Sequence, residues 1–104
     1  MDQLHQIVNG CYNNDRRSQR SLYRRYYGYA LRISFRYLDT YEEATQLTND
    51  VFLHILRNFS RFRHAGNGKM DLDLTAWIKT KTIAAWQKDK PDIHKRPAIF
   101  LLQA

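Results

Sequence analysis

The chain has 104 residues, a length that supports one hydrophobic core and leaves no room for a second domain. Apolar residues make up 43% of it and aromatic residues 13%, which excludes an intrinsically disordered chain. Its 17 Lys and Arg residues against 10 Asp and Glu residues give a formal net charge of +7. That excess favours a polyanionic partner, nucleic acid before membrane.

Two helices are expected in the first third of the chain. Residues 2–12 predict a short helix with one apolar side, and Asp15 is a good N-cap for a long second helix over residues 16–38. That second helix has two apolar faces, so we expect it to be buried between neighbouring helices. The first face consists of Leu22, Tyr26, Tyr29, Ala30, Ile33 and Tyr37, and the second of Tyr27, Leu31, Phe35 and Leu38.

Residues 39–62 predict the helix around which the fold is organised. Asp39 or Thr40 can cap its start, and one broad arc of apolar residues faces the core. That arc consists of Ala44, Leu47, Val51, Phe52, Ile55, Leu56 and Phe59. The opposite face is polar except for Leu53 at its centre, and an apolar anchor inside a polar rim has the form of a small protein-binding epitope. The candidate partner-binding residues are therefore Gln46, Asn49, Asp50, Leu53 and Arg57.

A last helix is expected after a basic loop over residues 63–71. Asp71 or Asp73 can cap its start, and Pro91 stops it. Its core-facing residues are predicted to be Leu74, Trp77, Ile78, Ala84 and Ala85, with Lys81 on the same arc, and its far side carries Lys79, Trp86 and Lys90. The prediction is an all-α domain over residues 1–90, built from three main helices plus a short N-terminal one. A tail over residues 91–104 follows, in which Ile99 to Leu102 could cover an apolar groove.

Nucleic-acid binding is indicated at two places. In residues 23–37 arginines alternate with aromatic residues, as in surfaces that stack single strands, although helical spacing favours packing of these tyrosines in the core. The second place is the basic loop with the outward face of the last helix, for which a solvated basic surface is the alternative. The candidate DNA-binding residues there are Arg61, Arg63, Asn67, Lys69, Lys79, Trp86 and Lys90.

Enzymatic chemistry has little support in the sequence. The four histidines are scattered without zinc-ligand spacing, and no glycine-rich phosphate loop is present, so we expect no catalytic residue, metal or cofactor. The single cysteine, Cys11, excludes an internal disulfide and is expected to be a small core residue. No apolar run approaches membrane-spanning length and no signal peptide begins the chain, so we expect a cytoplasmic protein.

The organising helix resembles region 2 of the sigma-70 family of bacterial transcription initiation factors, most closely its extracytoplasmic-function group. The resemblance rests on Ala44, Leu47, Asp50, Val51, Phe52, Leu53 and Ile55, extends upstream over residues 13–38 and downstream to Ala76-Trp77-Ile78, and covers about three quarters of the chain. It implies that this helix docks on the clamp helices of the largest subunit of core RNA polymerase. It also implies that the loop and last helix capture the unpaired non-template strand of the promoter −10 region, and that an anti-sigma factor is a possible partner.

The sequence also departs from the family pattern. The family usually has an acidic residue at Gln46, a Gln at Asn49 and a Glu at Asp50; it has an apolar residue at Lys81 and an Asn at Ala84. These 104 residues contain no counterpart of the second family domain, which reads the upstream promoter element, so we expect either an isolated or truncated first domain or a diverged one. The sequence therefore leaves open a second interpretation, a polymerase-binding remnant or decoy that does not read promoter DNA.

Overall fold

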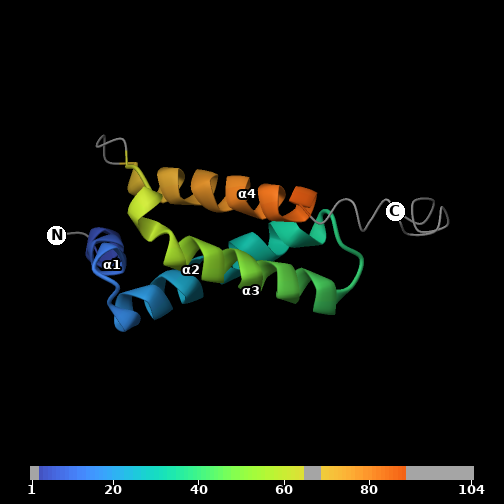
Figure 1. Ribbon diagram of the computed structural model, residues 1–104, viewed down its shortest axis with the longest axis horizontal. Coiled ribbons are helices and arrows are strands. Elements are labelled where there is room, and N and C mark those ends of the chain that lie inside the picture. The colour runs from blue at the N-terminus through green and yellow to red at the C-terminus, as the bar shows by residue number, and fades with distance from the viewer. Residues whose placement is uncertain (1–2, 65–68, 89–104) are drawn as a thin grey trace.

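The computed structural model describes residues 3–64 and 69–88. These residues form four α-helices and one 3₁₀ turn, and no strand occurs among them (Figure 1). The elements are α1 (Gln3–Tyr12), α2 (Arg16–Phe35), α3 (Tyr41–Arg57), η1 (Phe59–Arg61) and α4 (Met70–Lys88). The predicted all-α fold, with three main helices and a short N-terminal one, is confirmed.

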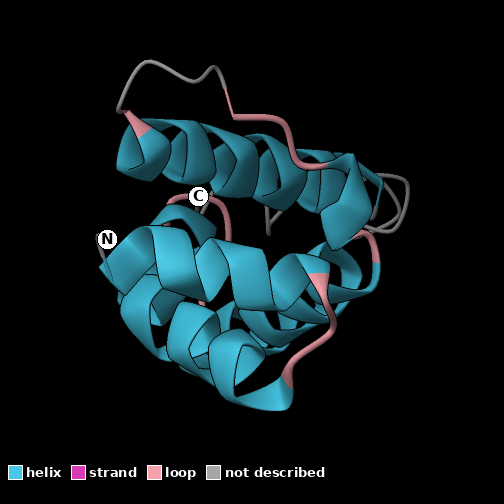
Figure 2. Ribbon diagram, turned by 90° about the vertical axis from the view of Figure 1, so that its left-hand side faces the viewer, coloured by secondary structure: helices cyan, strands magenta, loops and turns pink. Residues whose placement is uncertain are grey.

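The three long helices lie side by side. Helices α2 and α3 run in opposite directions, and α4 packs against both of them (Figures 1 and 2). The short α1 packs mainly against α2 and closes the end of the bundle where α4 begins. This arrangement places one side of α3 in the core and leaves its other side in solvent.

Two of the three predicted N-caps are present. The Asp15 carboxylate accepts a hydrogen bond from the Ser18 amide at 3.0 Å, and the Thr40 hydroxyl accepts one from the Glu43 amide at 3.1 Å. Each cap satisfies a backbone donor that the first turn of a helix leaves without an intrahelical acceptor. Asp71 and Asp73 are not caps: α4 begins at Met70, and both carboxylates lie in its first turn.

The core is formed by one buried stripe from each helix. The largest fully buried side chains include Phe52, Phe59, Phe62, Leu22, Ile55, Leu74 and Ile78. On α3 the predicted arc is confirmed, except that Leu56 is only half-buried. Trp77 is half-buried on the inward side of α4, where its ring packs on Phe59 and Phe62 with centroid distances of 5.6 and 5.2 Å.

The close approach of α2 to α3 depends on small polar residues. Ser34 and Thr48 are both 0% exposed, and their hydroxyl oxygens lie 3.0 Å apart. Each hydroxyl is also within hydrogen-bond distance of a carbonyl in its own helix, Ala30 for Ser34 and Ala44 for Thr48. A buried hydroxyl without a partner would cost free energy, so this contact satisfies both groups where the helices meet.

The second apolar face predicted for α2 is only partly buried, although Tyr27 and Leu38 pack against the core. Tyr27, Leu31 and Leu38 are half-buried, and Phe35 is 43% exposed. The helix also ends at Phe35, three residues before the predicted end, and residues 36–38 form a hydrogen-bonded turn after it. The prediction that α2 is buried on two faces is wrong, because its buried residues lie on one side of the helix: Leu22, Tyr26, Ala30, Ile33 and Ser34.

Candidate interaction surfaces

The five predicted partner-binding residues lie together on the solvent side of α3. They are Gln46, Asn49, Asp50, Leu53 and Arg57, and all five are exposed. Leu53 is 50% exposed, although its neighbour Phe52 is fully buried. We call these five residues the α3 face. A solvent-exposed aliphatic side chain surrounded by polar residues is typical of the centre of a small protein-binding surface.

The α3 face is held in place by a contact with α2. The Tyr23 hydroxyl donates a hydrogen bond to the side-chain oxygen of Asn49 at 2.9 Å. The Tyr23 ring also packs edge-on against Phe52, with a centroid distance of 5.2 Å. Asn49 therefore presents its amide nitrogen in a fixed orientation beside Leu53, and this nitrogen can donate to a partner.

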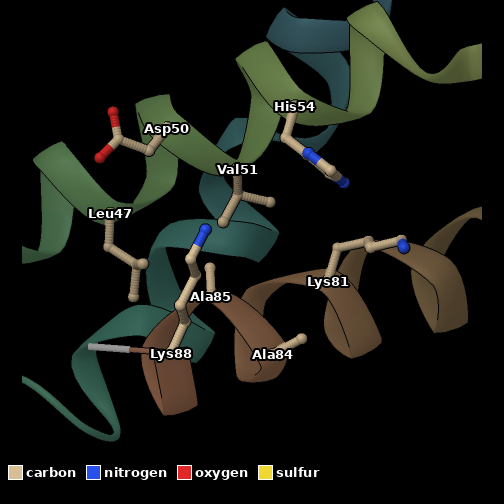
Figure 3. Close-up of a pocket in the computed structure, with 8 residues that line it drawn as sticks. All are labelled: Leu47, Asp50, Val51, His54, Lys81, Ala84, Ala85 and Lys88. Carbon is tan, nitrogen blue, oxygen red and sulfur yellow. The ribbon is translucent and has the colours of Figure 1, made fainter. Parts of the chain in front are cut away.

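A groove runs along the side of α3 that faces α4. It has a volume of about 390 Å³ and is lined by Leu47, Asp50, Val51, His54, Lys81, Ala84, Ala85 and Lys88 (Figure 3). Its floor is apolar, and the side chain of Lys88 extends from α4 toward Leu47 and Val51. Asp50 borders both this groove and the α3 face, so a partner seated on Leu53 would also reach the groove's edge.

The predicted DNA-binding residues differ in their exposure and contacts. Arg61, Arg63, Lys69 and Lys79 are exposed, as predicted. The Arg63 guanidinium donates to the backbone carbonyls of Ser60 at 2.7 Å and Phe62 at 3.0 Å, so part of its hydrogen-bonding capacity is used within the chain. Asn67 and Lys90 lie outside the described residues, as does the tail with Ile99 to Leu102.

The predicted position of Trp86 on the outward face of α4 is wrong. Its ring stacks on Tyr37 with a centroid distance of 4.4 Å and an interplanar angle of 28°, and the side chain packs against the core. The buried stripe of α4 consists of Met70, Leu74, Ile78 and Thr82, and this stripe turns Trp86 toward the end of α2. Trp86 therefore offers no free ring face for a base on the side of Lys79.

Because the buried side of α4 differs from the predicted one, two further residues of this helix also lie elsewhere than predicted. Ala84, predicted to face the core, is exposed at the rim of the groove. Lys81, predicted on the core arc, is half-buried, and its stem lines the groove instead. A lysine accepts this position because its alkyl stem covers apolar surface while its ammonium group stays hydrated.

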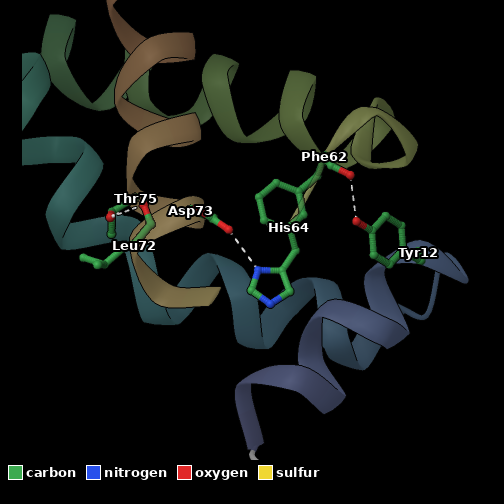
Figure 4. A network of polar contacts seen from close by, with 6 residues as sticks. All are labelled: Tyr12, Phe62, His64, Leu72, Asp73 and Thr75. Atoms are coloured by element: carbon green, nitrogen blue, oxygen red, sulfur yellow. Dashed lines mark hydrogen bonds and ion pairs between the residues drawn. The ribbon is translucent and has the colours of Figure 1, made fainter. Parts of the chain in front are cut away.

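Two polar contacts that the sequence did not predict hold the segment before the loop. His64 Nδ1 lies 2.9 Å from the Asp73 carboxylate, and the Tyr12 hydroxyl donates to the Phe62 carbonyl at 2.7 Å (Figure 4). They join α1 and the first turn of α4 to residues 62–64. No spacing rule could have found them, because their partners are 9 and 50 positions apart.

Two buried titratable groups serve the fold rather than chemistry. Burial, and secondarily the charge of Asp15, raises the pKa of the Cys11 thiol to about 12, so this thiol is an inert core residue as predicted. Burial first, and then the hydrogen bond to Asp71 at 2.5 Å, raises the pKa of the Tyr26 hydroxyl above its ordinary value. This hydroxyl stays protonated and ties α2 to α4.

No group of three His, Cys, Asp or Glu side chains that could bind a metal occurs among residues 3–64 and 69–88. Within the part of the chain that the structure describes, no helix combines the length and the apolar character that crossing a membrane requires. No family model matches the chain, and no curated protein sequence or solved structure matches it either. The functional interpretation therefore depends on the side chains described above.

Because Trp86 packs on Tyr37, its loss should affect stability before it affects any ligand. We expect Trp86→Ala to lower the free energy of unfolding by about 2 kcal/mol, below the range for a fully buried tryptophan because Trp86 is only half-buried. Urea unfolding followed by circular dichroism measures the loss, with Lys79→Ala as the exposed control on the same helix. An unchanged midpoint for Trp86→Ala would show that the ring is free in solution.

Proposed function

We propose that this chain is a sigma-70 region 2-like module that docks on core RNA polymerase through the α3 face. The observation that carries the proposal is Leu53, which is half exposed at the centre of Gln46, Asn49, Asp50 and Arg57 on a rigid helix. The buried side of α3 fixes its rotation, so docking needs little reorganisation of this face. Leu53 supplies the desolvated anchor, and the surrounding polar groups supply orientation and exclude water. The proposed role is binding rather than catalysis, in the bacterial cytoplasm.

The second part of the proposal is contact with the unpaired promoter strand. Arg61, Lys69 and Lys79 are exposed, and cations of this kind contact phosphates. Specific reading requires contacts to bases, and here Trp86 is stacked on Tyr37 while Ala84 offers no hydrogen-bonding side chain. We therefore propose that strand binding at this surface is weak, electrostatic and tolerant of sequence.

The alternative function is a polymerase-binding remnant or decoy that does not read promoter DNA. The inward position of Trp86 favours it, because a stacking side chain is missing from the exposed face of α4. Both functions use the α3 face, and they differ only in whether nucleic acid binds beside Lys79. An anti-sigma factor would be a partner for the first function.

Replacing the apolar centre of the α3 face should weaken docking substantially. We expect Leu53→Asp to weaken binding to bacterial core RNA polymerase by about 2 kcal/mol or more, roughly 30-fold, because a carboxylate replaces the desolvated anchor. Binding is measured with the immobilised polymerase and labelled chain at fixed salt.

The matched control is Leu72→Asp. Leu72 is 59% exposed on α4, so the same substitution is made at an equally accessible leucine outside the α3 face. Leu72→Asp should bind polymerase like the parent chain, and both variants should keep the parent's helical circular dichroism. Equal binding by Leu53→Asp and the parent would contradict docking through the α3 face. Unfolding of Leu53→Asp would show instead that Leu53 is a core residue.

Strand binding at the loop and α4 should respond to salt. We expect the double variant Arg61→Gln/Lys79→Gln to bind a promoter-like single strand more weakly and to lower the slope of log affinity against log salt by about 1.4, or roughly 0.7 for each phosphate that is no longer neutralised. A scrambled strand should bind within about tenfold of the original. Fluorescence anisotropy over a salt series measures both quantities.

The two functions give different outcomes in this assay. A strong preference for one short motif that persists at physiological salt would contradict weak electrostatic binding and indicate a base pocket. A double variant indistinguishable from the parent in affinity and slope would favour the decoy, provided that polymerase binding is retained.

A further inference from the structure

The solvent side of α2 carries a row of residues that neither proposed surface uses. We call it the α2 stripe, and it consists of Arg17, Arg20, Arg24, Gly28, Leu31 and Phe35. All are exposed except Leu31, which is half-buried. At 100° per residue these positions fall opposite the buried residues of α2, such as Leu22 and Ala30. The stripe extends for about 27 Å, from a rise of 1.5 Å per residue.

The N-terminal half of the stripe is strongly cationic. Helix α2 contains six arginines and no aspartate or glutamate. Within residues 3–64 and 69–88, Arg20 and Arg24 form no ion pair, while Arg17 lies near the capping carboxylate of Asp15. Like charges four positions apart destabilise a helix slightly, so this arrangement is unfavourable for the fold itself. It is favourable for holding a polyanion.

The centre of the stripe is a glycine that the fold does not require. A Cβ atom added at Gly28 would meet nothing within 4 Å, and Gly28 lies in the middle of a regular helix. Glycine at such a position costs up to about 1 kcal/mol relative to alanine. What it provides is a flat site at which another molecule can approach the helix backbone closely.

The C-terminal half of the stripe presents aromatic rings to solvent. Phe35 is 43% exposed and Tyr41, at the start of α3, is 64% exposed. Their ring centroids are 6.1 Å apart and the ring planes are inclined by 36°. These rings lie past the end of the arginine row, with Leu31 between the two halves, so the surface continues from cationic to aromatic along one helix.

We propose that the α2 stripe binds single-stranded nucleic acid, with phosphates on Arg17, Arg20 and Arg24 and unpaired bases against Phe35 and Tyr41. A cationic row beside accessible rings is the combination that holds single strands without sequence preference, because every base has a face that can stack. A membrane surface is disfavoured, since an interfacial helix needs an apolar face along its length and that face of α2 is buried in the core. This surface is separate from the one proposed at Arg61 and Lys79.

The test compares two pairs of arginines in the full chain. Arg20→Gln/Arg24→Gln removes two cations from the stripe, and Arg32→Gln/Arg36→Gln removes two exposed cations, also four positions apart, from the neighbouring strip of the same segment. The probe is a labelled oligothymidylate, titrated over a salt series. We expect the stripe pair to lower affinity at least tenfold and to lower the salt slope by about 1.4, and the neighbouring pair to do much less.

Two further variants test the aromatic end and the glycine. Phe35→Ala should weaken oligothymidylate binding about tenfold, and its effect should disappear when the probe is a duplex, whose bases are not free to stack. Gly28→Leu should keep or raise thermal stability, since a helix former replaces glycine in open space, yet weaken binding by blocking close approach. Gly28→Ala is the matched control, with a stability gain and little reduction in binding.

The outcomes separate this proposal from its rivals. Equal losses of affinity for the two arginine pairs would show that net charge alone is responsible, and would overturn the proposal. Binding to vesicles of phosphatidylserine and phosphatidylcholine but not to oligothymidylate would assign the stripe to a membrane and overturn it as well. The affinity losses from Arg20→Gln/Arg24→Gln and from Arg61→Gln/Lys79→Gln should add if the surfaces are independent, so failure of one leaves the other measurable.

Discussion

The close approach of α2 and α3 at Ser34 and Thr48 is the contact on which the rest of the structure depends. Both residues are small and fully buried, and their hydroxyl oxygens are 3.0 Å apart, so neither helix can turn about its axis without separating a satisfied buried pair. Leu53 lies five residues after Thr48, about 140° farther around α3. With Thr48 fixed against α2, Leu53 must face solvent. The rotation of one helix pair thereby determines that an aliphatic side chain stands exposed at the centre of the α3 face.

Helix α4 carries the second part of the proposed function, and its rotation limits what that part can be. Its buried stripe includes Thr82, whose hydroxyl donates to the Ile78 carbonyl at 2.7 Å and so can be buried in an apolar core. With Thr82 inside, Trp86 one turn later lies against Tyr37, and Ala84 reaches the rim of the groove. The exposed side of α4 therefore keeps the cation of Lys79 but not an aromatic ring. A cation that contacts phosphates but no bases increases the affinity for a nucleic-acid strand without distinguishing one base sequence from another.

The sequence predicted more of α3 than of α2 or α4, for physical reasons. On α3 a broad apolar arc faces an almost uninterrupted polar one, so its buried side and its exposed Leu53 follow from period alone. Helix α4 has apolar residues around most of its circumference, with Leu72 exposed and Thr82 buried. The spacing of its apolar residues therefore does not predict which side of the helix is buried. The aromatic residues of α2 predicted a second buried face, whereas Phe35 is 43% exposed, and the ring beside it, Tyr41 of α3, is itself exposed. The contacts of His64 with Asp73 and of Tyr12 with Phe62 join distant positions and left no local signal.

Thiol labelling of Leu53→Cys tests most directly whether α3 presents position 53 to solvent and to polymerase. Cys11 is 1% exposed and serves as the protected thiol within the same molecule. We expect Cys11 to stay unmodified in the native chain, the thiol introduced at position 53 to react at the rate of an exposed cysteine, and core RNA polymerase to protect it. Labelling at position 53 as slow as that of Cys11 would contradict the rotation of α3, and fast labelling unchanged by bound polymerase would contradict docking through this face.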